Sequence, residues 1–273
     1  MWFERLADML RRCAAASAFL VFLAGMPFAA TAAADKTVTL ATLPNYSPYA
    51  MYASEQERPA EIVVPPGQRH PHFEGFSWEV LREAFHSQDY TVRLRIVPWS
   101  RAMQELRAGK VDLLFPTGKN AERLSYMAYS EEPVNVVDFH IYVRADSEIT
   151  WQGLDTFAGG RVAVMPGWNY GDAWKAKERI EKHPVESVAQ GFELLKRGRI
   201  DGFAGYELPW GRYLNRTQKR DTFRKLPKFG GTAEYVTALE NNPQAEKLLA
   251  IFDRGKRQLS ARGRIAELRQ RWQ

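Results

Sequence analysis

Cysteine is almost absent from this chain, since only one of the 273 residues, Cys13, is a cysteine. Cys13 lies within the first 34 residues, so residues 35–273 contain neither a disulfide framework nor a thiol-based site. Histidine is also scarce, with five in the chain. His70 and His72 share one loop without a third ligand at a characteristic spacing, and the other histidines are isolated. We therefore expect no metal site, no cofactor and no catalytic residue.

Long apolar runs are missing beyond the first 34 residues. A basic start precedes the apolar stretch Ala14–Phe28, and Ala30–Ala34 supplies small residues suited to a signal peptidase. The alternative, a membrane anchor, is disfavoured because the stretch is interrupted by Gly25 and Pro27 and is shorter than the roughly 20 residues that cross a bilayer. The sequence predicts a cleaved signal peptide at residues 1–34 and a soluble periplasmic product.

A concentrated basic segment is also lacking. The formal net charge is +6, and the lysines and arginines are spread along the chain. Scattered basic residues are typical of a solvated surface, so we expect no nucleic-acid partner. The length of residues 35–273 allows one large domain or two of ordinary size.

Hydrophobic periodicity in the first half predicts strands and helices in alternation. The strands are expected at 36–42, 92–96 and 111–115, and the helices at 76–85 and 100–108, the second capped by Ser100. Residues 54–72 lack a period and are expected to form a long surface loop. The order β-α-β-α-β favours a parallel sheet.

The second half repeats this logic. Strands are expected at 134–143, 161–165, 200–204 and 235–239, and helices at 172–181, from Ser187 to Arg197, from Pro243, and after Ser260. The segments Leu106–Asp112 and Leu195–Asp201 share one pattern: a helix end, a glycine, a basic residue, a strand and an aspartate. Two halves built by the same rule are the simplest interpretation.

Arg123 follows the buried-looking strand 111–115 and a turn of Pro, Thr, Gly and Asn residues. A guanidinium near the carboxyl end of a strand suits bidentate capture of a carboxylate. Such strand ends are also where open α/β sheets bind ligands. Arg123 is therefore the first candidate for ligand binding.

Several short motifs occur in a characteristic order. They are Tyr46–Tyr49, Gly75-Phe76, Trp99, Gly109–Asp112, Ala121–Arg123, Tyr129–Pro133, Gly159–Gly167, Gly198–Asp201 and Gly263–Ile265. In these the chain resembles the extracellular solute-binding proteins of family 3, the periplasmic amino-acid receptors of ABC import systems. The resemblance covers nearly all of residues 35–273. It implies an α/β fold of two lobes, the type II periplasmic-binding-protein fold, with two crossover hinge strands. Lobe one would comprise residues 35–134 plus 236–273, and lobe two residues 135–235.

The resemblance also implies roles for single residues. Arg123 matches the arginine that holds the ligand's α-carboxylate, and Thr117 lies near a hydroxyl residue that shares this task, although the spacing differs by one. Trp99 matches a position that contacts the ligand side chain. Tyr46 and Tyr49 lie in the loop that supplies an aromatic wall.

Two positions in the expected second lobe depart from the family pattern. Trp168, followed by Asn169, stands where a small hydroxyl residue is common after Gly167. Tyr206 stands where an aspartate would pair with the ligand's ammonium, and Glu207 beside it is a possible substitute. These four residues, Trp168, Asn169, Tyr206 and Glu207, complete the ligand-binding candidates.

The expected function is binding of a small carboxylate-bearing solute by a monomer that delivers it to the membrane permease of an ABC transporter, without catalysis. Two alternatives stay open. One is a periplasmic dehydratase acting on a prephenate-like substrate, with Glu207 or Glu132 as general acid. The other is a receptor that presents its ligand to a sensor kinase.

Overall fold

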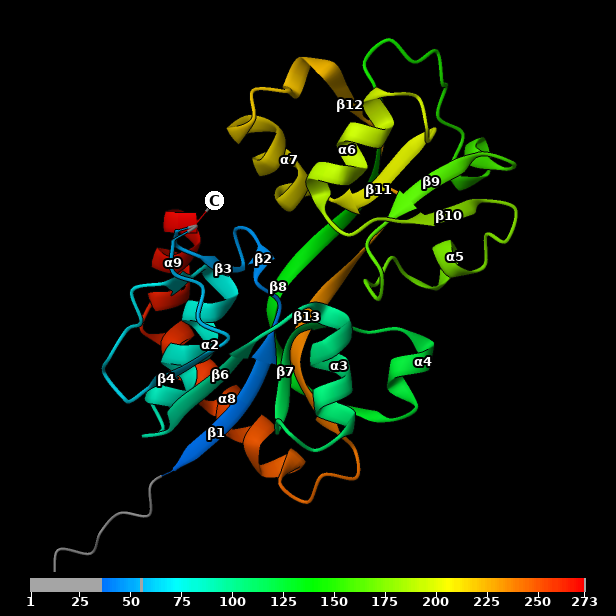
Figure 1. Ribbon diagram of the computed structural model, residues 1–273. Helices are drawn as coiled ribbons and strands as arrows, with labels where there is room; N and C mark the ends of the chain where they lie inside the picture. Colours follow the sequence, from blue (N-terminus) through cyan, green and yellow to red (C-terminus); the bar gives the residue numbers. More distant parts are fainter. Residues whose placement is uncertain (1–35, 55, 273) are drawn as a thin grey trace, which may run out of the picture. The chain divides into compact units, whose positions relative to one another are not determined.

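One mixed sheet connects both halves of the chain (Figure 1). The computed structural model describes residues 36–54 and 56–272, and within them ten strands form this sheet. The strand order is β10-β9-β11-β8-β13-β7-β1-β6-β4, with β12 paired to β8. The expected signal peptide lies outside the described residues.

The first half contains three parallel strands, as the sequence predicts. β1 (Thr37–Thr42) lies between β6 (Thr91–Ile96) and β7 (Leu113–Gly118) and pairs parallel with both. Helix α2 (Phe76–His86) connects β1 to β6, and α3 (Trp99–Arg107) connects β6 to β7. The expected β-α-β-α-β order is confirmed.

The second half repeats the same arrangement. β9 (Arg161–Val164) lies between β10 (Glu181–Pro184) and β11 (Gly202–Tyr206), again with parallel pairing. Helix α6 (Val188–Lys196) precedes β11 and is capped by Ser187, whose hydroxyl oxygen accepts from the Gln190 amide. In each half, therefore, the parallel strand that comes first in the chain lies between the second and the third.

Two long strands lie in the middle of the sheet and join the halves (Figure 1). β8 (Met127–Arg144) and β13 (Gly230–Leu239) pair antiparallel along most of β13. β8 pairs antiparallel with β11, and β13 pairs antiparallel with β7. Because each contacts strands of a different half, they are the two crossovers that the sequence predicts.

The repeated sequence pattern has a repeated local structure. Gly109 and Gly198 end α3 and α6 with φ of 65° and 63°, a left-handed conformation that favours glycine. Three residues later, Asp112 accepts from the Thr39 amide at 2.9 Å and Asp201 accepts from the Arg161 amide at 2.7 Å. The two aspartates therefore tie equivalent strand pairs together.

Several boundaries differ from the prediction. The expected loop 54–72 contains the edge strand β4 (Glu61–Val64), and the expected helix 172–181 is only α5 (Asp172–Lys175) followed by β10. α3 begins at Trp99 after Pro98, without a side-chain cap, so Ser100 is not the cap. β7 continues through Thr117 to Gly118 rather than turning at Pro116.

The remaining elements are mostly short, except for α8, which packs in the core of the first half. They are β2 (Asn45–Tyr46), β3 (Ala50–Tyr52), β5 (Phe73–Glu74), α4 (Ala121–Leu124), η1 (Leu154–Phe157), α7 (Glu207–Arg216), η2 (Arg220–Thr222), β12 (Phe223–Lys225), α8 (Ala245–Ala261) and α9 (Arg264–Trp272). α7 and β12 were not predicted from the sequence. In the described part of the chain, no helix is both long and apolar enough to cross a membrane.

Candidate functional site

A small cavity lies where the carboxyl ends of β1, β7, β9 and β11 approach the middle of β13. Its volume is about 20 Å³. The residues that line it come from both halves of the sheet and from the crossover β13: Leu43, Tyr46, Trp99, Pro116, Gly118, Arg123, Trp168, Asn169, Tyr206 and Glu234. Six of the nine residues that the sequence predicts for ligand binding are among them. The volume is enough for about one water molecule.

Arg123 is positioned by α4 at the end of β7. Asn120 caps this short helix by accepting from the Arg123 amide at 2.8 Å. The guanidinium is buried; its Nη1 donates to the Gly118 carbonyl at 2.9 Å and its Nη2 to the Gly167 carbonyl at 2.8 Å. The Trp99 ring lies 5.9 Å from the guanidinium carbon, within cation–π range. Arg123 therefore connects β7 to the loop that follows β9.

The loop after β9 approaches the end of β7 closely because Gly118 has no side chain. A Cβ at Gly118 would lie 2.7 Å from the Asn169 Nδ2. That nitrogen donates to the Lys119 carbonyl at 2.9 Å, and the Asn169 Oδ1 accepts from the Gly171 amide at 3.0 Å. Asn169 is 5% exposed, so it holds the two loops together from inside the cavity wall.

Aromatic rings form the opposite wall of the cavity. Tyr46 contacts Trp168 edge-on, with centroids 5.2 Å apart, and Trp168 lies 4.9 Å from Tyr206. The Tyr206 hydroxyl donates to the Asn169 carbonyl at 2.5 Å. Burial raises the pKa of Tyr46 and of Tyr206 well above the ordinary value, so both hydroxyls stay protonated. The wall offers ring faces and uncharged hydroxyl groups.

Glu234 is the acidic residue of the cavity, and the sequence reasoning missed it. It is 4% exposed. Its Oε2 accepts from the Tyr46 hydroxyl at 2.7 Å and from the Asn135 Nδ2 at 2.6 Å. Asn135 is held by Ser77, whose hydroxyl donates to its Oδ1 at 2.7 Å. Burial raises the pKa of Glu234 from 4.5 to about 7, although both hydrogen bonds and the Arg123 charge oppose this shift.

Three predicted residues do not line the cavity. Thr117 is fully buried and accepts from the Thr237 hydroxyl at 3.1 Å. Tyr49 packs on the Tyr46 ring at 4.9 Å and lines a separate cavity of about 390 Å³. Glu207 begins α7, and its carboxylate pairs with Lys225. Glu207, the possible substitute for the family aspartate, therefore lies outside this cavity, whereas its neighbour Tyr206 lines it.

Local sequence gives little sign of Glu234. It lies between Ala233 and Tyr235 in a segment whose predicted strand begins at Tyr235. A single glutamate in a strand is typical of a solvated face, and charged residues are rarely buried. Its burial follows from long-range pairing, since Glu234 lies opposite Gly118 on β7 and Asn135 on β8.

The sequence of the chain was compared with protein-family models and with curated proteins. A family model described as bacterial extracellular solute-binding proteins, family 3, matches residues 38–273. No curated protein sequence matches this chain significantly.

Solved structures give the same result at low sequence identity. A substrate-binding protein of an amino acid ABC transporter superposes with a TM-score of 0.70 at 17% identity, covering 86% of this chain and 98% of that one. A mutant of the ArgBP protein from T. maritima gives 0.69 at 17%, covering 86% and 94%. A histidine kinase sensor domain with similarity to periplasmic binding proteins gives 0.69 at 20%, covering 86% and 95%. At these identities the likeness shows the fold, which is the mixed α/β fold of periplasmic binding proteins.

Proposed function

The chain belongs to the bacterial extracellular solute-binding proteins of family 3, and from this premise we propose that it captures a small carboxylate-bearing solute that also carries an amino group. The cavity around Arg123 and Glu234 is the proposed binding site. The observation that carries the proposal is the presence of one buried guanidinium and one buried carboxyl group in the same small cavity. An amino acid or a close relative has the complementary pair of charges.

Arg123 is suited to the carboxylate end of such a ligand. A guanidinium has five N–H donors, and two of them are used for the Gly118 and Gly167 carbonyls. Three donors remain beyond these two hydrogen bonds, and a ligand carboxylate can accept from them. The bond to the Gly118 carbonyl of β7 holds the guanidinium in place before the ligand arrives, which lowers the entropy that binding costs.

Glu234 is suited to the ammonium end. The family aspartate is replaced by Tyr206, and Glu234 supplies a carboxyl group to the same cavity from β13. Its Oε2 already accepts two hydrogen bonds, which fix the orientation of the carboxyl group. Trp99, Trp168 and Tyr46 would contact the apolar part of the ligand with their rings.

Ligand entry requires the cavity walls to separate. Sites for small molecules usually measure about 300–1,000 Å³, whereas this cavity measures about 20 Å³. The contacts to be broken are those of Gly167 and Asn169 with the end of β7. We propose that lobe one (35–134 plus 236–273) and lobe two (135–235) move apart by bending of β8 and β13, a hinge motion.

The proposed role is delivery of the solute to the permease of an ABC importer, by a monomer in the periplasm. A receptor for a sensor kinase is the related alternative, since the sensor domain above shares the fold. Glu234 also gives a reason to test the dehydratase alternative, because a general acid needs a pKa near the working pH and that of Glu234 is about 7. Glu207 and Glu132, the general acids expected from the sequence, pair with Lys225 and Lys256 and do not line this cavity.

The proposal is tested by thermal-shift screening of the purified protein with amino acids, dicarboxylates and aromatic acids. We expect stabilisation by at least one compound that carries both a carboxylate and an amino group. Arg123→Lys keeps the charge but loses the bidentate geometry, so it should weaken the binding of each hit. The matched control is Arg161→Ala, which removes a half-exposed arginine outside the cavity.

Two results would contradict the proposal. One is the absence of stabilisation by any carboxylate in the screen. The other is equal ligand affinity in the Arg123→Lys variant and the control. Loss of prephenate in an absorbance assay, abolished by Glu234→Gln, would instead favour the dehydratase.

A further inference from the structure

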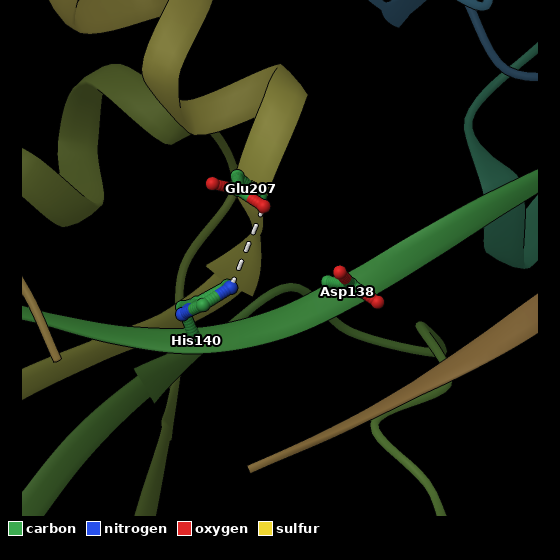
Figure 2. Close-up of side chains that lie close together, drawn as sticks. All are labelled: Asp138, His140 and Glu207. Atoms are coloured by element: carbon green, nitrogen blue, oxygen red, sulfur yellow. Dashed lines mark ion pairs between the residues drawn. The ribbon is translucent and has the colours of Figure 1, made fainter. Parts of the chain in front are cut away.

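Asp138, His140 and Glu207 form a cluster outside the proposed solute site (Figure 2). Asp138 and His140 are two residues apart on β8 and therefore share one face of the sheet. Glu207 is the first residue of α7, directly after β11, and His140 pairs in register with Gly205 of β11. One ligand atom from each of the three side chains lies within 4.8 Å of the others. Strand pairing thus brings together residues that are 67 positions apart in the sequence.

His140 is already held in the tautomer that a metal requires. Its ring is 5% exposed, and its Nδ1 lies 2.9 Å from the Leu226 carbonyl. A carbonyl is an acceptor, so Nδ1 carries the hydrogen and the neutral ring has its lone pair on Nε2. A backbone carbonyl on the second ring nitrogen is the usual support of a metal-binding histidine.

The Nε2 atom of His140 is buried and, within the described residues, has no hydrogen-bond partner. It faces the Glu207 Oε2 at a distance of 3.6 Å, the pair marked in Figure 2. Two acceptors facing one another in a partly buried place repel each other unless a cation lies between them. That cation is either a proton on Nε2 or a metal ion.

We propose that Asp138, His140 and Glu207 bind a divalent first-row transition metal ion, of which Zn²⁺ is the representative. One imidazole nitrogen and two carboxylate oxygens suit such an ion, whereas Mg²⁺ and Ca²⁺ prefer oxygen ligands alone. Three protein ligands leave a fourth position for water, as in open zinc sites. The site differs from the proposed solute site in its residues and in its chemistry.

Two lysines compete with the metal ion. Lys228 lies 2.5 Å from the Asp138 Oδ1, and Lys225 pairs with the Glu207 Oε1. Their side chains are 52% and 38% exposed, so each can turn to solvent when a metal ion takes its place. Because each lysine occupies one carboxylate oxygen, removing either lysine should strengthen metal binding.

The test is calorimetric titration of the chelator-treated protein with ZnCl₂, and with MgCl₂ and CaCl₂ in parallel. We expect one Zn²⁺ per chain and no response to Mg²⁺ or Ca²⁺. Glu207→Gln and Asp138→Asn, both at partly exposed positions, should each weaken Zn²⁺ binding by about tenfold or more. Lys225→Met should strengthen it several-fold.

The matched control is His72→Ala, because the loop containing His70 and His72 also offers imidazole nitrogens to Zn²⁺. His72 pairs there with Glu57 at 2.6 Å. Loss of Zn²⁺ binding in His72→Ala with retention in Glu207→Gln would overturn the proposal. So would a ¹⁵N NMR spectrum in which His140 is protonated on both nitrogens at neutral pH and does not change when Zn²⁺ is added.

Discussion

Replacing Glu234 by glutamine should stabilise the protein at neutral and alkaline pH. Glu234 is 4% exposed, and burial raises its pKa from 4.5 to about 7. Glutamine has nearly the same shape and can accept from Tyr46 and Asn135 through its amide oxygen. It never ionises, so it does not incur the cost of a charge inside the cavity.

The magnitude follows from the pKa shift and its sign. Between pH 4.5 and 7 the folded chain keeps the Glu234 proton while the unfolded chain has released it. The free energy of unfolding therefore falls as the pH rises through this window, and it stops falling above the folded-state pKa. The whole shift corresponds to about 3 kcal/mol, at about 1.4 kcal/mol per pKa unit. The stability difference between Glu234→Gln and the original protein should grow by about this amount between pH 4.5 and 8.

Urea unfolding at five pH values from 4.5 to 8 measures this difference, since most other groups are common to both proteins and cancel. The control is Glu193→Gln, which removes an exposed partner of Arg197 on α6. The stability differences of the two variants are compared at each pH. The reasoning would be refuted if the difference in unfolding free energy between Glu234→Gln and the original protein were the same at all pH values. It would also be refuted if Glu234→Gln became less stable relative to the original protein as the pH rises. The second outcome would mean that Glu234 is ionised in the folded state and is stabilised by Arg123.

Three other predictions concern the proposed solute site, and a fourth concerns α7. An amino-bearing ligand should bind more tightly as the pH rises toward 7, because an ammonium pairs with ionised Glu234; calorimetry from pH 5.5 to 8 should show this trend in the original protein and not in Glu234→Gln. Arg123→Ala should weaken ligand binding at least about thirty-fold, which corresponds to the lower end of the roughly 2–5 kcal/mol for a lost buried charge pair. Gly118→Ala should destabilise the protein by about 1–3 kcal/mol because its Cβ would displace Asn169. Gly211→Ala, where the described residues leave open space around the Cβ on α7, should stabilise it by about 0.5–1 kcal/mol.

The alternation of strands and helices was predictable because the central strands are buried and apolar. β1 and β6 contain buried residues that recur with the period of a strand, β7 is buried along its whole length, and Gly109 ends the helix between β6 and β7. The edge strands were not predictable. β10 consists of Glu181-Lys182-His183-Pro184 and contacts only β9, so pairing rather than local preference creates it. β4 is the edge strand at the other end of the sheet, and it lies within the polar segment that was expected to be a loop.

α7 was missed for a different reason. Its sequence contains Pro209 and Gly211, two residues that usually indicate a loop. Pro209 is the third residue of the helix, where the missing amide is tolerated because the first turn has no intrahelical acceptor for it. Trp210 and Leu214 are buried beneath the helix and stabilise it through tertiary packing.

The site was predictable where the chain order of the motif determines the geometry. Trp99 begins α3 shortly after β6, and Arg123 lies on α4 shortly after β7, so both side chains reach the cavity from strand ends. For Tyr206 and Glu207, one position along the chain decides between cavity and surface. Tyr206 is the last residue of β11 and faces Trp168, whereas Glu207 turns away with α7 to meet Lys225. A strand period of two makes neighbouring residues face opposite directions, and the exact end of the strand was not visible in the sequence.

The placement of Glu234 links the proposed site to the strands that join the halves of the sheet. Glu234 lies in register opposite Gly118, and the Gly118 carbonyl accepts from Arg123. On its other side Glu234 lies opposite Asn135 of β8, which donates to its carboxyl group. Glu234 therefore lies on one of the two strands that join the halves of the sheet, and Arg123 is hydrogen-bonded to the neighbouring strand β7. Bending of β8 and β13 would change the distance between Arg123 and the loop after β9, while Glu234 stays at the pivot. An ammonium group would then bind first near the hinge, and the carboxylate contacts would be completed as the cavity closes.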